Sequence, residues 1–457
     1  MTVNNNRYLP GEHSRARFLR LDAATILKRF YRCERSLIVS QSAWLAGIAA
    51  LEAKMTLPRF TWQDTLTAHA LRERVFELRY PRRMLEIGED APLVEVFDES
   101  INAPSAQAFI LALAQVFKPA LLSAYRSYID SADDLSDGPI LRALNLAIEE
   151  KEAQIGWLES QVEAMAGSER GQRQEAERWA SALQERLEQV GGLSLEAAHP
   201  APTPNDLPGR RPFKLAEVPA RDPRFHLCHF YWPDIIDPNF AYGEGINLQL
   251  RSGVSHLNEV WAVETGGAIL HAFADDLDWE YIYDAARWTY DESRHVLMGY
   301  ERLRAWGFAL HEMPLGSYIY DSAAGQEPIV RLGMLHYFET KNIGNKVKRA
   351  EAFAQYQDRM SQHDMEFDWA DETIHAAYGK RWHTALHEKF PDRIPDMDGL
   401  HRRCDELVAI EIAAATDAER ADIRQVADAM IAKAGEIGLN EPAQAAQPAQ
   451  PSPAEAQ

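Results

Sequence analysis

Two short motifs in the second half of the chain each place a carboxylate and an imidazole three residues apart. Glu292 and His295 lie in WTYDESRHVLMGYERL, and Glu372 and His375 lie in MEFDWADETIHAAYGKRW. Residues three apart lie on one face of a helix, so each pair can bind a metal ion without bending the backbone. Two such helices would supply ligands for two ions.

A single ExxH motif is weak evidence, because a chain of this length is expected to contain about one by chance. Here each glutamate also follows an acid, Asp291 in the first motif and Asp371 in the second. A metal-bound imidazole usually needs an acceptor for its other N–H. We therefore expect these two aspartates to orient the histidines from behind.

A site for two ions needs one more glutamate from each of two further helices, and the sequence offers Glu264 and Glu339. Each lies in a largely apolar segment with helical periodicity, where a buried acid is costly unless it is paired or binds a metal. The order glutamate, ExxH, glutamate, ExxH is the ligand order of di-metal carboxylate bundles. His336 and Asp368 could reach the metals as extra ligands, although such residues are more often satisfied core groups.

The donor set favours iron or manganese. Four carboxylates and two imidazoles are hard-to-borderline ligands, and they lack the thiolates of a structural zinc site. The three cysteines are far apart, with no CxxC pair, so a disulfide framework is not indicated either. Four carboxylates would also neutralise two divalent ions.

The elements that must position these residues are helices, and we expect an all-α protein. Apolar residues three and four apart continue over about 20–165 and 250–390, a further helix is expected over 400–436, and residues 191–223 are rich in Gly and Pro. The stretch 306–328 is long enough for a crossover between two helix pairs. The expected divisions are a helical domain (1–165), a charged helix and linker (166–245), the metal domain (246–390), a C-terminal helical segment (391–436) and a disordered tail (437–457).

The composition excludes several classes of protein. With 48 Lys and Arg against 69 Asp and Glu, the net charge is −21, which would repel nucleic acid. No apolar run approaches the roughly 18–20 residues that span a bilayer, and the first residues show no signal-peptide core. We expect a soluble, cytoplasmic protein without nucleic-acid or membrane partners.

The DESRH and DETIHAAYGKRW segments resemble the ferritin-like di-metal carboxylate superfamily, most closely an uncharacterised bacterial ferritin-like family, over roughly 250–385. The resemblance implies a four-helix bundle with a crossover that binds two irons, or manganese with iron, and activates O2. The ligands that it implies are Glu264, Glu292, His295, Glu339, Glu372 and His375, with Asp291 and Asp371 behind the histidines and Glu292 and Glu372 as the catalytic pair.

This resemblance predicts an oxygenase or oxidase that oxidises a small organic substrate with electrons from a ferredoxin or a separate reductase. Iron oxidation and storage with the same ligands is one alternative, and a non-catalytic helical scaffold is another. The sequence leaves the substrate, the reaction outcome and the oligomeric state open, a homodimer included.

The first half could be a damaged copy of the second. Glu34 lies in an apolar helical segment, as Glu264 does. Lys151 and Gln154 occupy the places where a glutamate and a histidine would be expected. Alignment of the second helices puts Ala70 and Glu73 where Glu292 and His295 stand. Such a half would be structural and would bind no metal. The alternative is chance similarity, because amphipathic helical sequences resemble one another without common origin.

Overall fold

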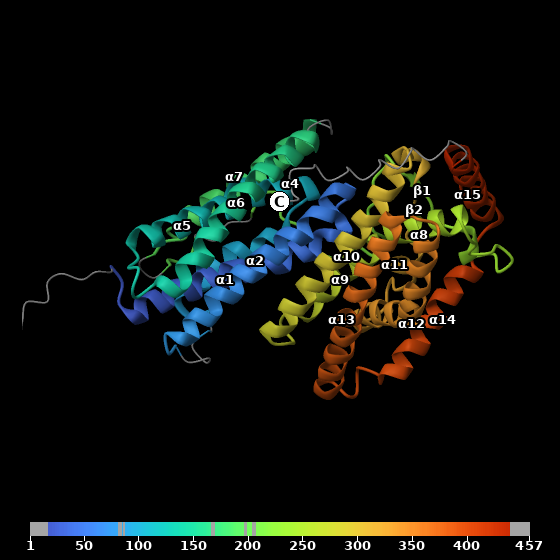
Figure 1. Ribbon diagram of the computed structural model, residues 1–457. Coiled ribbons are helices and arrows are strands. Elements are labelled where there is room, and N and C mark those ends of the chain that lie inside the picture. The colour runs from blue at the N-terminus through green and yellow to red at the C-terminus, as the bar shows by residue number, and fades with distance from the viewer. Residues whose placement is uncertain are drawn as a thin grey trace, which may run out of the picture.

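The computed structural model describes residues 17–80, 85, 87–165, 170–195, 199–202 and 207–438, and these are predominantly helical, as expected. The described part contains only two strands, β1 (His226–Leu227) and β2 (Pro314–Leu315), which pair in parallel. They join the segment before the second helical block to the connection within it. Figure 1 shows the earlier helices on one side of the molecule and the later ones on the other.

The first half contains seven α-helices among its described residues, together with short 3-10 and π segments. The α-helices are α1 (Arg20–Trp44), α2 (Leu51–Glu77), α3 (Ala91–Asp98), α4 (Ala106–Ala112), α5 (Lys118–Ser131), α6 (Gly138–Met165) and α7 (Arg170–Gln189). The 3-10 segments are η1 (Leu45–Gly47), η3 (Gly88–Asp90) and η4 (Glu99–Asn102), and the π segment is η5 (Leu113–Phe117).

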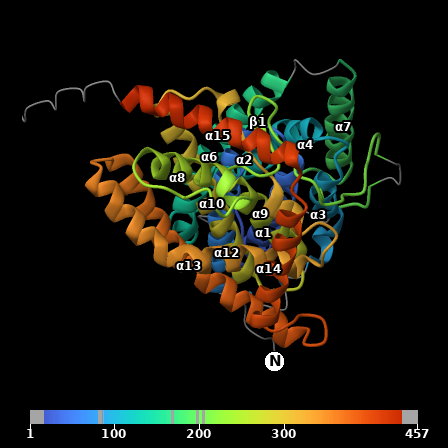
Figure 2. The ribbon, with the colours of Figure 1, turned by 90° about the vertical axis from the view of Figure 1, so that its right-hand side faces the viewer.

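The second half contains eight α-helices among its described residues. They are α8 (Ile246–Asn258), α9 (Val260–Phe273), α10 (Trp279–Ala305), α11 (Tyr318–Ser322), α12 (Pro328–Gln355), α13 (Arg359–Lys389), α14 (Met397–Ala413) and α15 (Asp417–Gly438), with 3-10 turns η6 (Pro233–Ile235) and η7 (Leu310–Glu312). Helix α12 packs along α13 and α14, and α15 crosses α8 (Figure 2).

The helix expected over 400–436 is in fact two helices. Thr416 and Glu419 form a capping box: the Thr416 hydroxyl accepts from the Glu419 backbone N–H, and the Glu419 carboxylate accepts from the Thr416 backbone N–H. This exchange satisfies two backbone donors at the start of α15 and favours a new helix there. The tail expected at 437–457 lies outside the described residues from 439 onward.

The two halves share one apolar core. Helices α1 and α2 pack against α9 and α10. Gly267 permits the close approach of α9, because a Cβ there would lie 2.3 Å from the carbonyl oxygen of Ser42 on α1. A side chain at this position would push the halves apart.

The region between the halves is better packed than a connector would be. Trp179 and Leu183 of α7 are buried against the first half, so this charged helix is amphipathic rather than fully solvated. The Gly- and Pro-rich segment after it lacks α-helix in its described residues but is fixed at several points. Asp222 accepts from the Leu51 backbone N–H at the start of α2, and the Ala220 N–H donates to the Ala46 carbonyl.

One segment does reach the length and apolarity that could cross a membrane, contrary to the sequence-based expectation. It runs continuously from Ala106 to Ser131 through α4, η5 and α5. In its most apolar window 72% of the residues are buried inside the protein. That burial is typical of a core helix in a soluble protein.

Candidate metal centre

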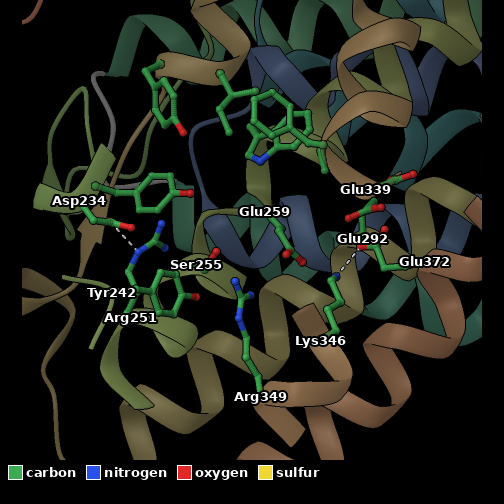
Figure 3. Close-up of a pocket in the computed structure, with 16 residues that line it drawn as sticks. Asp234, Tyr242, Arg251, Ser255, Glu259, Glu292, Glu339, Lys346, Arg349 and Glu372 are labelled. Atoms are coloured by element: carbon green, nitrogen blue, oxygen red, sulfur yellow. Dashed lines mark hydrogen bonds and ion pairs between the residues drawn. The ribbon is translucent and has the colours of Figure 1, made fainter. Parts of the chain in front are cut away.

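The two ExxH motifs face each other across the interior of the second half. Helix α10 carries Glu292 and His295, and α13 carries Glu372 and His375, all at most 3% exposed. Glu339 approaches from α12. Figure 3 shows the carboxylates of Glu292, Glu339 and Glu372 directed at one another.

One group consists of Glu292, Glu339, Glu372 and His375. Each contributes one potential ligand atom, and these atoms all lie within 4.8 Å of one another. The His375 Nδ1 atom is 3.1 Å from Glu292 Oε1 and 3.6 Å from Glu339 Oε1. Three carboxylates and one imidazole could hold a single metal ion.

A second group lies beside the first and shares Glu292 with it. His295 Nδ1 is 3.3 Å from Glu259 Oε2 and 3.5 Å from Glu292 Oε2. Asp368 Oδ1 is 3.6 Å from the same nitrogen. The arrangement therefore offers two neighbouring positions for cations, with Glu292 between them.

The aspartates of the two motifs hold the histidines, but across the interface between helices. His375 Nε2 is 3.4 Å from Asp291 Oδ2, and His295 Nε2 is 3.4 Å from Asp371 Oδ2. Each aspartate thus orients the histidine of the opposite helix. This pairing turns the Nδ1 edge of each ring into the cluster, where a bound cation would take its lone pair.

Two arginines of α10 neutralise these aspartates from outside the cluster. Arg287 Nε is 2.7 Å from Asp291 Oδ2, and Arg294 pairs with both Asp291 and Asp371. Because these pairs hold both aspartates from outside, the charge at the cluster centre comes from the inner carboxylates.

Several buried atoms at the centre form no hydrogen bond with any residue that the structure describes. They are the Nδ1 atoms of His295 and His375 and one carboxylate oxygen each of Glu259, Glu292, Glu339 and Glu372. Buried polar atoms are nearly always satisfied, and an unsatisfied one costs roughly 1–3 kcal/mol. All six are potential metal ligands in two adjoining groups, so two neighbouring cations would satisfy them.

Lys346 of α12 belongs to the same centre. Its ammonium lies 2.8 Å from Glu372 Oε1 and 2.5 Å from Asp368 Oδ1, while His256 Nε2 is 3.0 Å from the other oxygen of Asp368. Five inner carboxylates and one ammonium leave four negative charges if the histidines are neutral. Two divalent cations would balance that charge.

The crowding of acids appears in their pKa values. Burial raises the pKa of Glu372 to about 7, with Lys346 opposing the shift and Asp368 adding to it. Burial and the neighbouring Glu372 and Glu292 hold the pKa of Glu339 well above its usual range. The cluster therefore retains protons that a metal ion would displace.

Glu264, expected among the ligands, lies elsewhere. It is fully buried and forms ion pairs with Lys54 of α2 and Arg221 of the inter-half segment. Glu259, five residues earlier and at the break between α8 and α9, reaches the cluster instead. Five residues rotate a helix by on the order of 140°, so both glutamates could not face the same site.

A signal for Glu259 was present in the sequence. Glu259 precedes Glu292 by 33 residues, and Glu339 precedes Glu372 by the same 33. Glu264 breaks this symmetry, because it stands only 28 residues before Glu292. Equal spacing is expected where two helix pairs deliver equivalent ligands to one centre.

The two suggested extra ligands have different positions. Asp368 lies in the cluster. His336 does not, since its Nδ1 is 2.9 Å from His401 Nε2 of α14. Burial, together with His401 and His383, lowers the pKa of His336 to about 4, as expected for a neutral packed imidazole.

The first half also has a buried polar centre, in which lysines replace metal ligands. Lys151 Nζ is 2.8 Å from Glu34 Oε1, and Lys118 Nζ is 2.8 Å from Asp64 Oδ2 and 2.7 Å from Gln154 Oε1. Lys151 also pairs with Asp64. Two ammonium groups and two carboxylates balance, so this centre needs no cation.

This centre agrees only in part with the comparison of the two halves. Lys151 does lie beside Glu34, as the alignment implied, and Gln154 joins the same centre through Lys118 and Asp64. The contribution of α2 is Asp64, whereas Ala70 is outside the centre and Glu73 is exposed beside Arg72.

A cavity of about 300 Å³ adjoins the acidic cluster. Glu259, Glu292, Glu339 and Glu372 line one end of it, and Arg251, Tyr242 and Asp234 line the other (Figure 3). Its size is at the lower limit of small-molecule sites. A small organic molecule would therefore contact the cluster directly.

A family described as a protein of unknown function (DUF455) matches residues 244–400. No curated protein and no solved structure matches the chain. The matched stretch contains every residue of the two ligand groups, but the family description gives no activity for them.

Proposed function

We propose that the second half is a ferritin-like di-metal carboxylate bundle, built from α8 with α9, α10, α12 and α13, and that it is an O2-dependent oxidoreductase acting on a small organic molecule. The observation that carries the proposal is the set of six buried ligand atoms that form no hydrogen bond with any described residue and belong to two adjoining groups. A structural acid cluster would be expected to balance its carboxylates with ammonium groups, as the lysine-containing centre of the first half does.

The residues present fit two metal ions. Glu339, Glu372 and His375 would hold one ion and Glu259 and His295 the other, with Glu292 available to both. Bound iron or manganese would supply the redox chemistry, which protein side chains do not provide. The carboxylate and imidazole donors match both metals.

The side chains around the ligands have separate tasks in this proposal. Asp291 and Asp371 fix the histidine rings with Nδ1 inward. Lys346 holds Asp368 and Glu372 and offsets part of the negative charge. Trp261 and Phe338 form an apolar wall of the cavity, which excludes water from the place where a substrate would react.

The cavity favours substrate oxidation over iron storage, the other function that the same ligands could serve. Its far end has positively charged and aromatic side chains, which transit of iron would not require. Because such a site must be reduced again after each turnover, the proposal includes an external electron donor, a ferredoxin or a separate reductase.

Consumption of O2 tests this proposal. The full chain is loaded anaerobically with Fe(II), mixed with O2 and a reductant, and compared with Glu292→Gln and with Glu301→Gln, an exposed position on the same helix. We expect the rate of O2 loss per chain to fall at least tenfold in Glu292→Gln and to stay within twofold in Glu301→Gln. Equal rates in all three proteins, at equal iron content and melting temperature, would reject the proposal.

A further inference from the structure

The end of the cavity away from the acids contains a buried guanidinium that is only partly satisfied. Arg251 is 7% exposed, and its Nε donates to Asp234 Oδ1 over 2.8 Å, but its Nη1 has no hydrogen-bond partner in the described part of the chain. The rings of Tyr231 and Tyr242 lie 5.4 and 4.8 Å from this guanidinium. Burial of an unpaired donor is costly, so the site has capacity for an acceptor.

A second guanidinium and a hydroxyl face the same space. Arg349 of α12 lines the cavity at 4.6 Å from the Tyr242 ring and forms no ion pair or hydrogen bond with any described residue. The buried Tyr242 hydroxyl also forms no hydrogen bond with the residues that the structure describes. Figure 3 shows Arg349 extending between Arg251 and Lys346.

The charges at this end favour a monoanion. Two guanidinium groups face one carboxylate, that of Asp234, which leaves one positive charge. A carboxylate matches that charge and the forked donor geometry of arginine. A phosphate dianion would carry one negative charge more than this end of the cavity balances.

We propose that Arg251, Arg349 and Tyr242 form the subsite for the carboxylate of a small organic acid. The rest of that acid lies along Trp261 and Phe338 and points toward Glu259 and Glu292. This assignment names the substrate class of the oxidoreductase proposed above and rests on it for the reaction, although binding itself needs no metal.

Binding of simple acids to the full chain, with and without added Fe(II), tests the subsite. The probes are benzoate and hexanoate, their neutral amides and inorganic phosphate, titrated calorimetrically under anaerobic conditions. At least one carboxylate is expected to bind at least tenfold more tightly than its amide and than phosphate. Arg349→Met is expected to weaken it at least tenfold.

The matched control is Lys348→Met, which removes the same charge from an exposed position one residue away. It is expected to change binding less than twofold. The inference is overturned if neither carboxylate binds, if an amide or phosphate binds as tightly, or if the two variants lose affinity equally.

Iron content, measured on the same samples, separates this inference from the proposed function. Arg349→Met is expected to keep the iron content of the wild type, because Arg349 is not a ligand. Loss of carboxylate binding with iron retained concerns the subsite alone. Carboxylate binding by a protein that takes up no iron would refute the metal centre and leave the anion subsite standing.

Discussion

Asp291 and Asp371 show how much of the centre depends on single side chains. Each lies 3.4 Å from Nε2 of the histidine on the opposite helix, and this turns Nδ1 toward the inner carboxylates, where a cation would bind. The DE doublets in the sequence predict an acid near each histidine. They do not predict the crossing, because helical spacing relates residues on one helix and says nothing of the helix opposite.

Replacement of Asp291 by Asn should therefore weaken metal binding without removing a ligand. The amide keeps the size of the side chain but loses the charge that favours the His375 Nε2–H tautomer, so we expect a 10- to 100-fold loss of metal affinity. Titration with Mn(II), followed by electron paramagnetic resonance, measures it. Asp392→Asn, an exposed control on the loop after α13, should bind as the wild type does. Unchanged affinity in Asp291→Asn would contradict the role assigned to the pair.

Five of the six expected ligands meet in one place, and the sixth shows the limit of the sequence pattern. The apolar neighbours of Glu264 correctly imply burial, but its partner is Lys54, 210 residues earlier in the chain. The local sequence cannot distinguish a buried acid that binds a metal from one that forms an ion pair with a distant lysine. Only the equal 33-residue spacing indicates Glu259.

At the scale of elements, the position of Glu259 depends on how closely α8 approaches α10. The backbone of Glu259, with φ −64° and ψ 0°, ends α8 before α9 begins. Beside it, Gly299 of α10 allows the backbones to touch, since a Cβ there would lie 2.2 Å from Leu257 N and 2.5 Å from Gly253 O.

Gly299→Ala should consequently destabilise the protein. The added methyl must displace backbone, and overpacking of this kind costs about 1–3 kcal/mol. Gly344→Ala in α12 is the matched control, because a Cβ there meets nothing within 4 Å, and a helical Gly-to-Ala change gains roughly 0.5–1 kcal/mol. Urea unfolding gives both values. A Gly299→Ala protein as stable as the control would refute the close contact.

The junction of α12, α13 and α14 should respond to acid. His336 has a pKa of about 4 in the folded protein against 6.5 as an ordinary histidine. The unfolded chain therefore binds more protons between these values, and stability is lost as pH falls from about 6.5 toward 4. The fall in melting temperature between pH 7 and pH 5 should be smaller in His336→Gln than in the wild type. Parallel pH profiles would show that His336 does not contribute.

At the scale of the whole molecule, two buried polar centres lie in one continuous core, and their charges differ. In the first half, Lys118 and Lys151 balance Glu34 and Asp64. In the second, Lys346 is the one Lys or Arg among the described residues that pairs with any of the five inner carboxylates. A duplication with loss of ligands in the first half stays a hypothesis, and it predicts that this half binds no metal.

Helical class, the two helical blocks and the irregular segment between them could be predicted from apolar spacing and from Gly and Pro. The packing of α7 onto the first half could not be predicted, because most of its sequence is charged or polar and only a few apolar residues, Trp179 and Leu183 among them, make the contact. The joining of the halves depends on Gly267 against Ser42, a tertiary contact that local patterns do not encode.

The most direct test of the metal centre is the metal content per chain after anaerobic loading with Fe(II), compared among wild type, Glu259→Gln and Glu264→Gln. If Glu264→Gln fails to fold, the double variant Lys54→Met/Glu264→Gln removes the charges of Lys54 and Glu264 together and keeps an amide oxygen to accept from Arg221. The proposal predicts two irons in the wild type and in the Glu264 variant that folds, and at most one in Glu259→Gln. Fewer than one iron in the wild type, or loss of iron on changing Glu264 but not Glu259, would contradict it.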